Sequence, residues 1–175
     1  NGIVTALRVS GTSVFAGTYG GVFLSTNNGA SWTAANSGVT NSTVNAFALS
    51  GPYVVYGGVL YGTTLIAGTN GGAFVTTNSG TSWTSANSGL ANTVVHALAV
   101  SGTNLFAGTS FGVFASTNNG ASWTSASTGL TCSTIYALGT NSTNLFAGTY
   151  GGVFVSTNNG ATWNAANTGL TISSI

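Results

Sequence analysis

The chain has 175 residues, with one Arg, no Lys, no Asp and no Glu, whereas an average soluble chain of this length carries about 40 charged residues. Without carboxylates there is no acid pair for hydrolysis. With one His and one Cys there is no multi-ligand zinc site and no intrachain disulfide. A net charge of +1 is also no electrostatic footprint for nucleic acid, so we expect no nucleic-acid partner, no metal and no cofactor.

The missing acidic residues have two explanations at this stage. One is a neutral surface rich in Ser, Thr and Asn, which suits an extracellular setting. The other is that Asn stands in the sequence where the protein carries Asp, and then the exclusion of acid chemistry does not hold. The mean hydropathy is +0.38, but no apolar run approaches the ~20 residues of a membrane-spanning helix. We therefore expect a secreted or cell-surface protein that does not insert into a membrane.

One unit is repeated four times along the chain. The copies start at Val4, Val44, Val95 and Ile135, which lie 40, 51 and 40 residues apart. The second copy is longer because it carries an 11-residue insertion within residues 52–64. We therefore predict a single region over residues 1–175 with units at 4–43, 44–94, 95–134 and 135–174.

Each copy predicts four short strands. The first is Val-x-Ala-Leu, the second Phe-Ala-Gly-Thr, the third Gly-Val-Phe-x-Ser-Thr, and the fourth starts at a Trp. Apolar residues with a period of two, bounded by Gly, Asn and Ser, are typical of strands. A four-stranded unit of about 40 residues is the period of a propeller blade. The predicted fold is an all-β propeller of four blades, either closed as a small ring or part of a larger propeller or a longer array.

An eight-residue motif links the third and fourth predicted strands, as in Ser25 to Trp32. Asn and Gly in its centre tolerate positive φ and favour a hairpin turn. The motif resembles the Asp-box, or bacterial neuraminidase repeat, with Asn at the Asp position. The resemblance implies a structural role for Asn27, Gly29, Trp32, Asn78, Gly80, Trp83, Asn118, Gly120, Trp123, Asn158, Gly160 and Trp163.

Asp-box propellers occur in sialidases, xyloglucan-degrading enzymes, sortilin-type receptors and photosystem assembly factors. The neutral repeats are most similar to large secreted or surface proteins of Bacteroidetes. In these families the box is structural, so the resemblance identifies no active site. A sialidase needs an arginine cluster and acidic partners, and a xyloglucanase needs two Asp, which this chain lacks. The resemblance therefore predicts a protein that is not an enzyme, unless the protein carries Asp where the sequence has Asn, or unless it has further blades.

Four individual features depart from the repeat. Arg8 occupies a slot that holds small residues in the other copies, and it is either a solvated edge residue or a ligand for a carboxylate or phosphate. The insertion is either a longer hairpin or a binding loop, and its candidate ligand-binding residues are Tyr53, Tyr56 and Tyr61. His96 lies in a slot of varied polarity, typical of exposed positions. Cys132 is interpreted as a small apolar filler.

Three functions remain open. The first is a non-catalytic scaffold or interaction module whose partner is another protein or further blades of the same protein. The second is a carbohydrate-binding module, or the non-catalytic part of a sialidase-like or xyloglucanase-like glycoside hydrolase. The third is an assembly factor for a membrane complex. Exposed apolar faces at the two ends of the blade array favour further blades, a partner subunit or ring closure.

Overall fold

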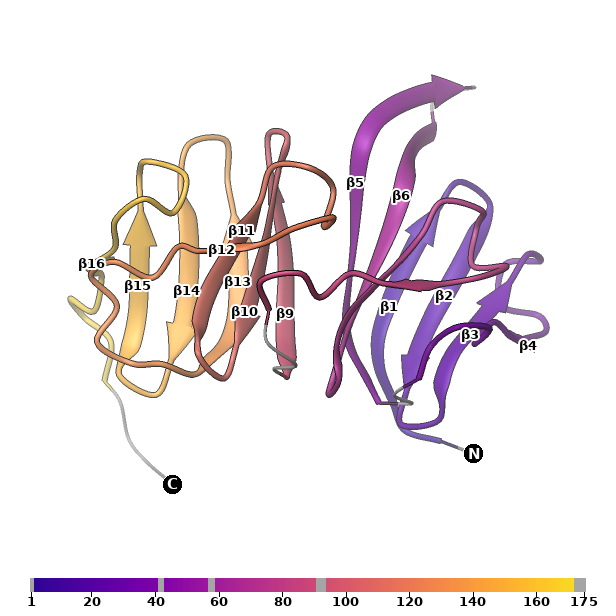
Figure 1. Cartoon of the computed structure of the whole chain (residues 1–175), viewed down its shortest axis with the longest axis horizontal. Coiled ribbons are helices and arrows are strands. Elements are labelled where there is room, and N and C mark those ends of the chain that lie inside the picture. Colours follow the sequence, from indigo (N-terminus) through magenta and orange to yellow (C-terminus); the bar gives the residue numbers. More distant parts are fainter. Residues whose placement is uncertain (1, 41–42, 57–58, 91–93, 172–175) are drawn as a thin grey trace.

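The computed structural model describes residues 2–40, 43–56, 59–90 and 94–171, with the backbone alone for residues 52–56 and 59–63. These residues form sixteen strands and no helix. Within them there is accordingly no helix with the length and apolarity to cross a bilayer. The strands form four antiparallel sheets of four strands each, and every sheet uses four strands that are consecutive in the sequence (Figure 1). This arrangement confirms the predicted all-β propeller fold class.

The four sheets, called blades 1 to 4, share one pattern of strands. Blade 1 comprises β1 (Val4–Ser10), β2 (Ser13–Thr18), β3 (Gly21–Ser25) and β4 (Thr33–Ala34). Blade 2 comprises β5 (Val44–Tyr56), β6 (Val59–Thr69), β7 (Gly72–Thr76) and β8 (Thr84–Ser85). Blade 3 comprises β9 (Val95–Ser101), β10 (Asn104–Thr109), β11 (Gly112–Ser116) and β12 (Thr124–Ser125). Blade 4 comprises β13 (Ile135–Thr140), β14 (Leu145–Thr149), β15 (Gly152–Ser156) and β16 (Asn164–Ala165).

The first strand of each blade lies closest to the common axis. β1 packs against β5, β5 against β9, and β9 against β13. The insertion lengthens β5 and β6, which stay paired from Tyr53 opposite Gly62 to Tyr56 opposite Val59. In Figure 1 these two strands extend past the ends of the neighbouring strands. The backbone of the insertion therefore forms a longer hairpin, which is one of the two interpretations given for this segment.

The hydrophobic core is divided into three clusters, and each cluster fills the space between two consecutive blades. Between blades 1 and 2, Phe15 and Val22 pack against residues of blade 2 that include Phe74 and Trp83. The other two interfaces repeat this arrangement with equivalent residues. A blade has two apolar faces and needs a neighbour on each side, because burial of apolar area contributes roughly 25 cal/mol per Å².

The Asn motif builds the turn between the third and fourth strands. In blade 1 the Ser31 N–H and the Ser25 hydroxyl both donate to Asn27 Oδ1, each at 2.9 Å. The Gly29 N–H donates to Ser25 Oγ at 2.8 Å. Asn28 and Gly29 have φ values of 57° and 86°, which Asn and Gly adopt at low cost. The same bonds recur in the other blades, so the turn that precedes the Trp of each motif has the same hydrogen-bonded structure in all four blades.

Candidate functional site

The Trp of the motif fastens its blade to the preceding blade. The Trp83 backbone N–H donates to Ser37 O at 2.8 Å, and the indole Nε1–H donates to Ala35 O at 2.9 Å. Trp123 and Trp163 make the equivalent bonds to blades 2 and 3. These three indoles are only 3–4% exposed. The interface between blades is therefore a repeated structure with a defined donor side and a defined acceptor side.

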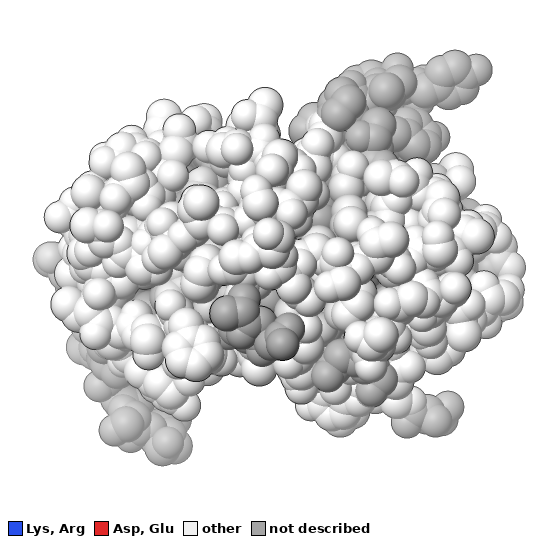
Figure 2. Space-filling model, viewed as in Figure 1, with Lys and Arg blue, Asp and Glu red and all other residues white. Residues whose placement is uncertain are grey.

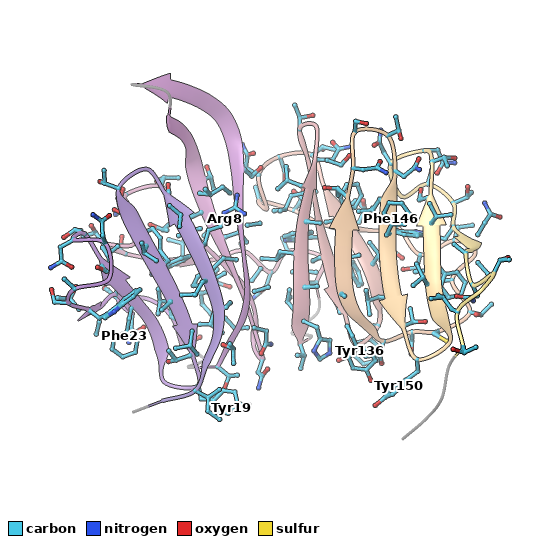
Figure 3. The ribbon with its side chains drawn as sticks, turned by 180° about the vertical axis from the view of Figure 1, so that it is seen from behind. Arg8, Tyr19, Phe23, Tyr136, Phe146 and Tyr150 are labelled. Carbon is cyan, nitrogen blue, oxygen red and sulfur yellow. The ribbon has the colours of Figure 1, made fainter. Side chains whose placement is uncertain are left out.

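Blade 1 exposes the donor side of this interface. Trp32 is 40% exposed, and no hydrogen bond joins its indole N–H to a described residue. Together with Gly2, Val4, Leu7, Ala16, Thr18 and Phe23 it lines a cavity of about 740 Å³ that is open to solvent. We call this surface the leading face, and Figure 3 shows Phe23 on it. Its counterparts in blades 2 to 4 are covered by the preceding blade.

Blade 4 exposes the acceptor side. Phe146 is half-buried, whereas its counterparts Phe15 and Phe106 are at most 1% exposed. A Cβ built on Gly169 would meet no atom within 4 Å, whereas one on Gly129 would lie 2.3 Å from Trp163 O. We call the surface made by Phe146, Val153, Ala166 and Leu170 the trailing face; Figure 3 labels its Phe146. Blades 1 and 4 are not joined, so the described residues form an open arc.

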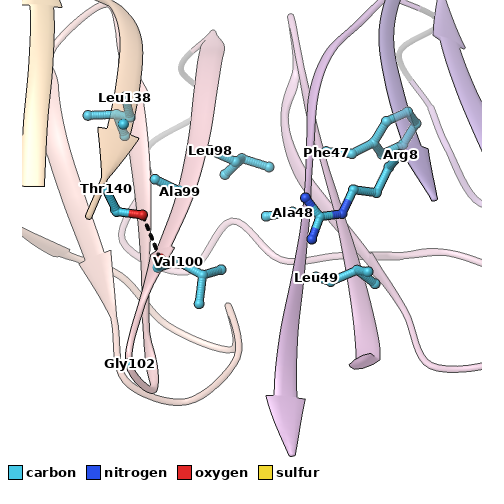
Figure 4. A pocket seen from close by; sticks show the side chains of 11 residues that line it. Arg8, Phe47, Ala48, Leu49, Leu98, Ala99, Val100, Gly102, Leu138 and Thr140 are labelled. Atoms are coloured by element: carbon cyan, nitrogen blue, oxygen red, sulfur yellow. Dashed lines mark hydrogen bonds between the residues drawn. The ribbon is translucent and has the colours of Figure 1, made fainter. Parts of the chain in front are cut away.

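A second cavity, of about 540 Å³, lies on the axis between the first strands of all four blades (Figure 4). These strands have only one neighbour each within their sheets, so backbone groups line the cavity beside Leu98, Val100 and Leu138. Arg8 reaches into it beside Ala48. The Arg8 Nε is buried and has no hydrogen-bond partner in the described part of the chain. The structure therefore places Arg8 at the axis, where it shares the cavity with Ala48, Ala99 and Gly139, the small residues at the equivalent position of the other three blades.

An aromatic cluster lies at the end of the axis where the first strands begin. The Tyr136 and Tyr150 rings meet edge to face at 4.8 Å, and the His96 ring lies 5.7 Å from Tyr136. Tyr150 is 82% exposed. A hydrogen bond with the Tyr150 side chain, with a smaller contribution from burial, raises the pKa of Tyr136. His96 Nε2 lies 3.1 Å from Ser110 Oγ, and burial lowers the pKa of His96.

Tyr136 and Tyr150 are not among the binding residues predicted from the sequence. Tyr136 lies at the irregularity of the β13–β14 ladder, between the pairs Ile135–Thr149 and Ala137–Gly148, and Tyr150 directly follows Thr149, so the pair is recognisable only once this register is known. Tyr53, Tyr56 and Tyr61, the predicted binding residues, have side chains outside the described part. Cys132 is half-buried, and a Cβ on Gly151 would lie 2.6 Å from its Sγ. Within the described residues, no group of three His, Cys, Asp or Glu side chains could hold a metal ion.

The surface offers no charge pattern for recognition. Figure 2 shows one face of the molecule on which no described Lys, Arg, Asp or Glu is visible. Arg8 is the single Lys or Arg of the whole sequence. The contacts that this surface can make are therefore apolar, aromatic or uncharged hydrogen-bonding ones, with Arg8 as the one Lys or Arg side chain.

A family described as the DUF6242 beta propeller domain matches residues 40–173 of this chain. The chain belongs to that family. A search of curated proteins found no match to this DUF6242 propeller domain.

Solved structures that resemble the DUF6242 propeller domain include an ancestral GH74 enzyme, with 22% identity and a TM-score of 0.73 over 96% of this chain and 25% of that one. Another is the extracellular domain assigned to a one-component system of B. thetaiotaomicron, with 16% identity and a TM-score of 0.69 over 92% and 22%. A third is YCF48 bound to D1 peptide, with 16% identity and a TM-score of 0.62 over 93% and 52%. The chain thus spans about a quarter of the GH74 enzyme. Identities this low support the fold alone.

Proposed function

We propose that this propeller domain is a non-catalytic, secreted or cell-surface scaffold or interaction module that joins another protein, or further blades of the same protein, through its leading and trailing faces. The observation that carries the proposal is the leading face, where Trp32 and Phe23 present a complete but uncovered copy of a surface that is buried at three other places. The extracellular location draws support from the neutral surface and from the resemblance to an extracellular domain. The lack of Asp and Glu in the sequence leaves no carboxylate for acid–base chemistry.

The proposal is tested by assaying the purified chain for turnover of xyloglucan and of a neuraminic acid glycoside, with intact mass measured on the same sample. We expect no turnover and a mass that agrees with Asn at the motif positions. Hydrolysis by the chain alone would contradict the proposal. A mass that requires Asp in place of Asn would remove the chemical argument against catalysis.

The aromatic cluster favours a second candidate function, the binding of a neutral glycan. Tyr136 and Tyr150 present two rings at an angle, and rings of this kind offer rigid amphipathic contact area at low entropic cost. His96 and Ser110 add polar groups beside the rings. None of these residues belongs to the leading face or the trailing face, so glycan binding and a scaffold function are compatible.

A glycan array tests this second function. We expect Tyr150→Ala and Tyr136→Ala to abolish any binding that the unchanged chain shows. Tyr19→Ala is the matched control, because Tyr19 follows β2 as Tyr150 follows β14, is 55% exposed, and has no described ring partner. Absence of binding to any sugar, or equal loss with the Tyr19 variant, would contradict glycan recognition by the cluster.

A further inference from the structure

One position of the repeat shapes the axial cavity. The fifth residue of every copy lines it, and this residue is Arg8 in blade 1 but Ala48, Ala99 and Gly139 in blades 2 to 4. A Cβ built on Gly139 would meet no atom within 4 Å. The three small residues therefore leave open the space into which Arg8 extends (Figure 4).

The Arg8 guanidinium has no partner among the described residues. It is half-buried, its Nε is fully buried, and no hydrogen bond joins it to another described side chain or carbonyl. The sequence contains no Asp or Glu that could pair with it. A polar group that loses water without gaining a partner costs free energy. Because the other copies pack well with Ala or Gly at this position, the fold does not require Arg8, and its placement points to a ligand.

The cavity combines aliphatic side chains with backbone polar groups. Leu98, Val100 and Leu138 line it, and the first strand of each blade turns an unpaired backbone edge toward it. The Thr140 hydroxyl donates to Val100 O at 3.2 Å and ties β13 to β9 beside the cavity. Its volume of about 540 Å³ lies within the range of about 300–1,000 Å³ that is usual for small-ligand pockets. A ligand here can bury an apolar body and still form hydrogen bonds.

Charge complementarity favours a carboxylate as the polar group of this ligand. A guanidinium binds a carboxylate through two parallel N–H···O bonds, and its single positive charge balances the single negative charge. A phosphate dianion would bring two negative charges to one positive charge. The unbalanced charge would then lie against Leu98, Val100 and Leu138, where burial of an unpaired charge is costly.

We infer that the axial cavity binds a small organic monocarboxylate, with the carboxylate on the Arg8 guanidinium and the apolar body against Leu98, Val100 and Leu138. All four blades supply lining residues, so the site is complete within the described part of the chain. The inference goes beyond the proposed scaffold function, because the cavity shares no lining residue with the leading face, the trailing face or the aromatic cluster. Loss of one function would therefore leave the other intact.

The Arg8 Nε–H signal in proton–nitrogen correlation spectra reports on this site directly, because the chain has a single Arg. The probes are hexanoate and benzoate, with hexanamide as the uncharged control and inorganic phosphate as the control for charge alone. We expect both acids to shift the signal in a saturable way, and both controls to bind at least about tenfold more weakly. The absence of a saturable shift with either acid, or equal binding of a control, would overturn the inference.

Two variants test the site by titration calorimetry with hexanoate. Arg8→Met removes the guanidinium, and Gly139→Leu keeps it but fills the open space beside it, so each should weaken binding at least about tenfold. Val9→Ala is the matched control, because Val9 follows Arg8 on β1, is 60% exposed and does not line the cavity. Unchanged affinity in Arg8→Met or Gly139→Leu, or an equal loss in Val9→Ala, would contradict the site. If a variant fails to fold, the Arg8 signal of the unchanged chain still decides the question.

Discussion

The variants Trp123→Ala and Trp32→Ala remove the same side chain from the same motif in different surroundings. Trp123 is 4% exposed and donates to Ala86 O at 2.8 Å, whereas Trp32 is 40% exposed. A packed Trp buries about 150–250 Å², so the difference in exposed fraction corresponds to about 80 Å², or about 2 kcal/mol at roughly 25 cal/mol per Å². The lost indole hydrogen bond adds about 1 kcal/mol. Trp123→Ala should therefore lower the free energy of unfolding by about 3 kcal/mol more than Trp32→Ala.

The assay is urea unfolding followed by far-ultraviolet circular dichroism, at a protein concentration low enough to keep the chains apart. Stacked repeats can unfold in parts, so the free energies of all transitions are summed before the two variants are compared. Equal destabilisation by the two substitutions would refute the reasoning, because it would mean that Trp32 is packed as tightly as Trp123 and that the arc is closed.

Four further predictions concern a glycine between blades, the turn motif, His96 and Arg8. Gly108→Ala should cost about 1–3 kcal/mol in thermal unfolding, because its Cβ would lie 2.7 Å from a side chain of the next blade, whereas Gly148→Ala has its nearest neighbour at 3.4 Å and should change little. Asn118→Asp keeps the Oδ1 acceptor and should change the free energy of unfolding by less than about 0.5 kcal/mol. Asn118→Ala removes this acceptor and should cost about 2 kcal/mol. Equal losses in the two variants would contradict the role of Asn118 Oδ1 in the turn. Burial lowers the pKa of His96 below 6.5, so the folded state binds its proton more weakly than the unfolded state. The free energy of unfolding should therefore be highest above pH 6.5 and fall as the pH drops from 6.5 through the pKa of the folded state. This pH dependence should disappear in His96→Gln. An unchanged pH dependence in that variant would show that it arises from a group other than His96. Arg8→Met should raise the melting temperature by removing an unpaired buried donor, and a lower melting temperature would show that the guanidinium has a stabilising partner.

The strand pattern could be predicted because its signals are local. Alternating apolar residues and the Asn-Gly turns act over a few residues, and four copies of the pattern reinforce each other. The resemblance to the Asp-box also predicted a structural role for the Trp of each motif. It did not predict that the Trp83 indole donates to Ala35, 48 residues earlier, because that bond depends on how whole blades stack.

The candidate sites could be predicted only in part, because they depend on the direction in which each side chain points once the blades are packed together. The sequence shows that the other copies have small residues at the position of Arg8. Only the packing of β1, β5, β9 and β13 shows that this position lines an axial cavity. Tyr136 and Tyr150 lie 14 residues apart and meet through the β13–β14 register, which exposure patterns alone do not reveal.

Hydrogen exchange of the four indole N–H groups tests the central claim most directly, because each reports on one edge of a blade. In dilute solution we expect slow exchange for Trp83, Trp123 and Trp163, whose buried indoles donate to carbonyls of the preceding blade, and fast exchange for Trp32. A Trp32→Phe variant assigns the fast signal. Four slow indoles in dilute solution, or fast exchange at any of the three joined positions, would contradict an open arc of blades fastened by Trp.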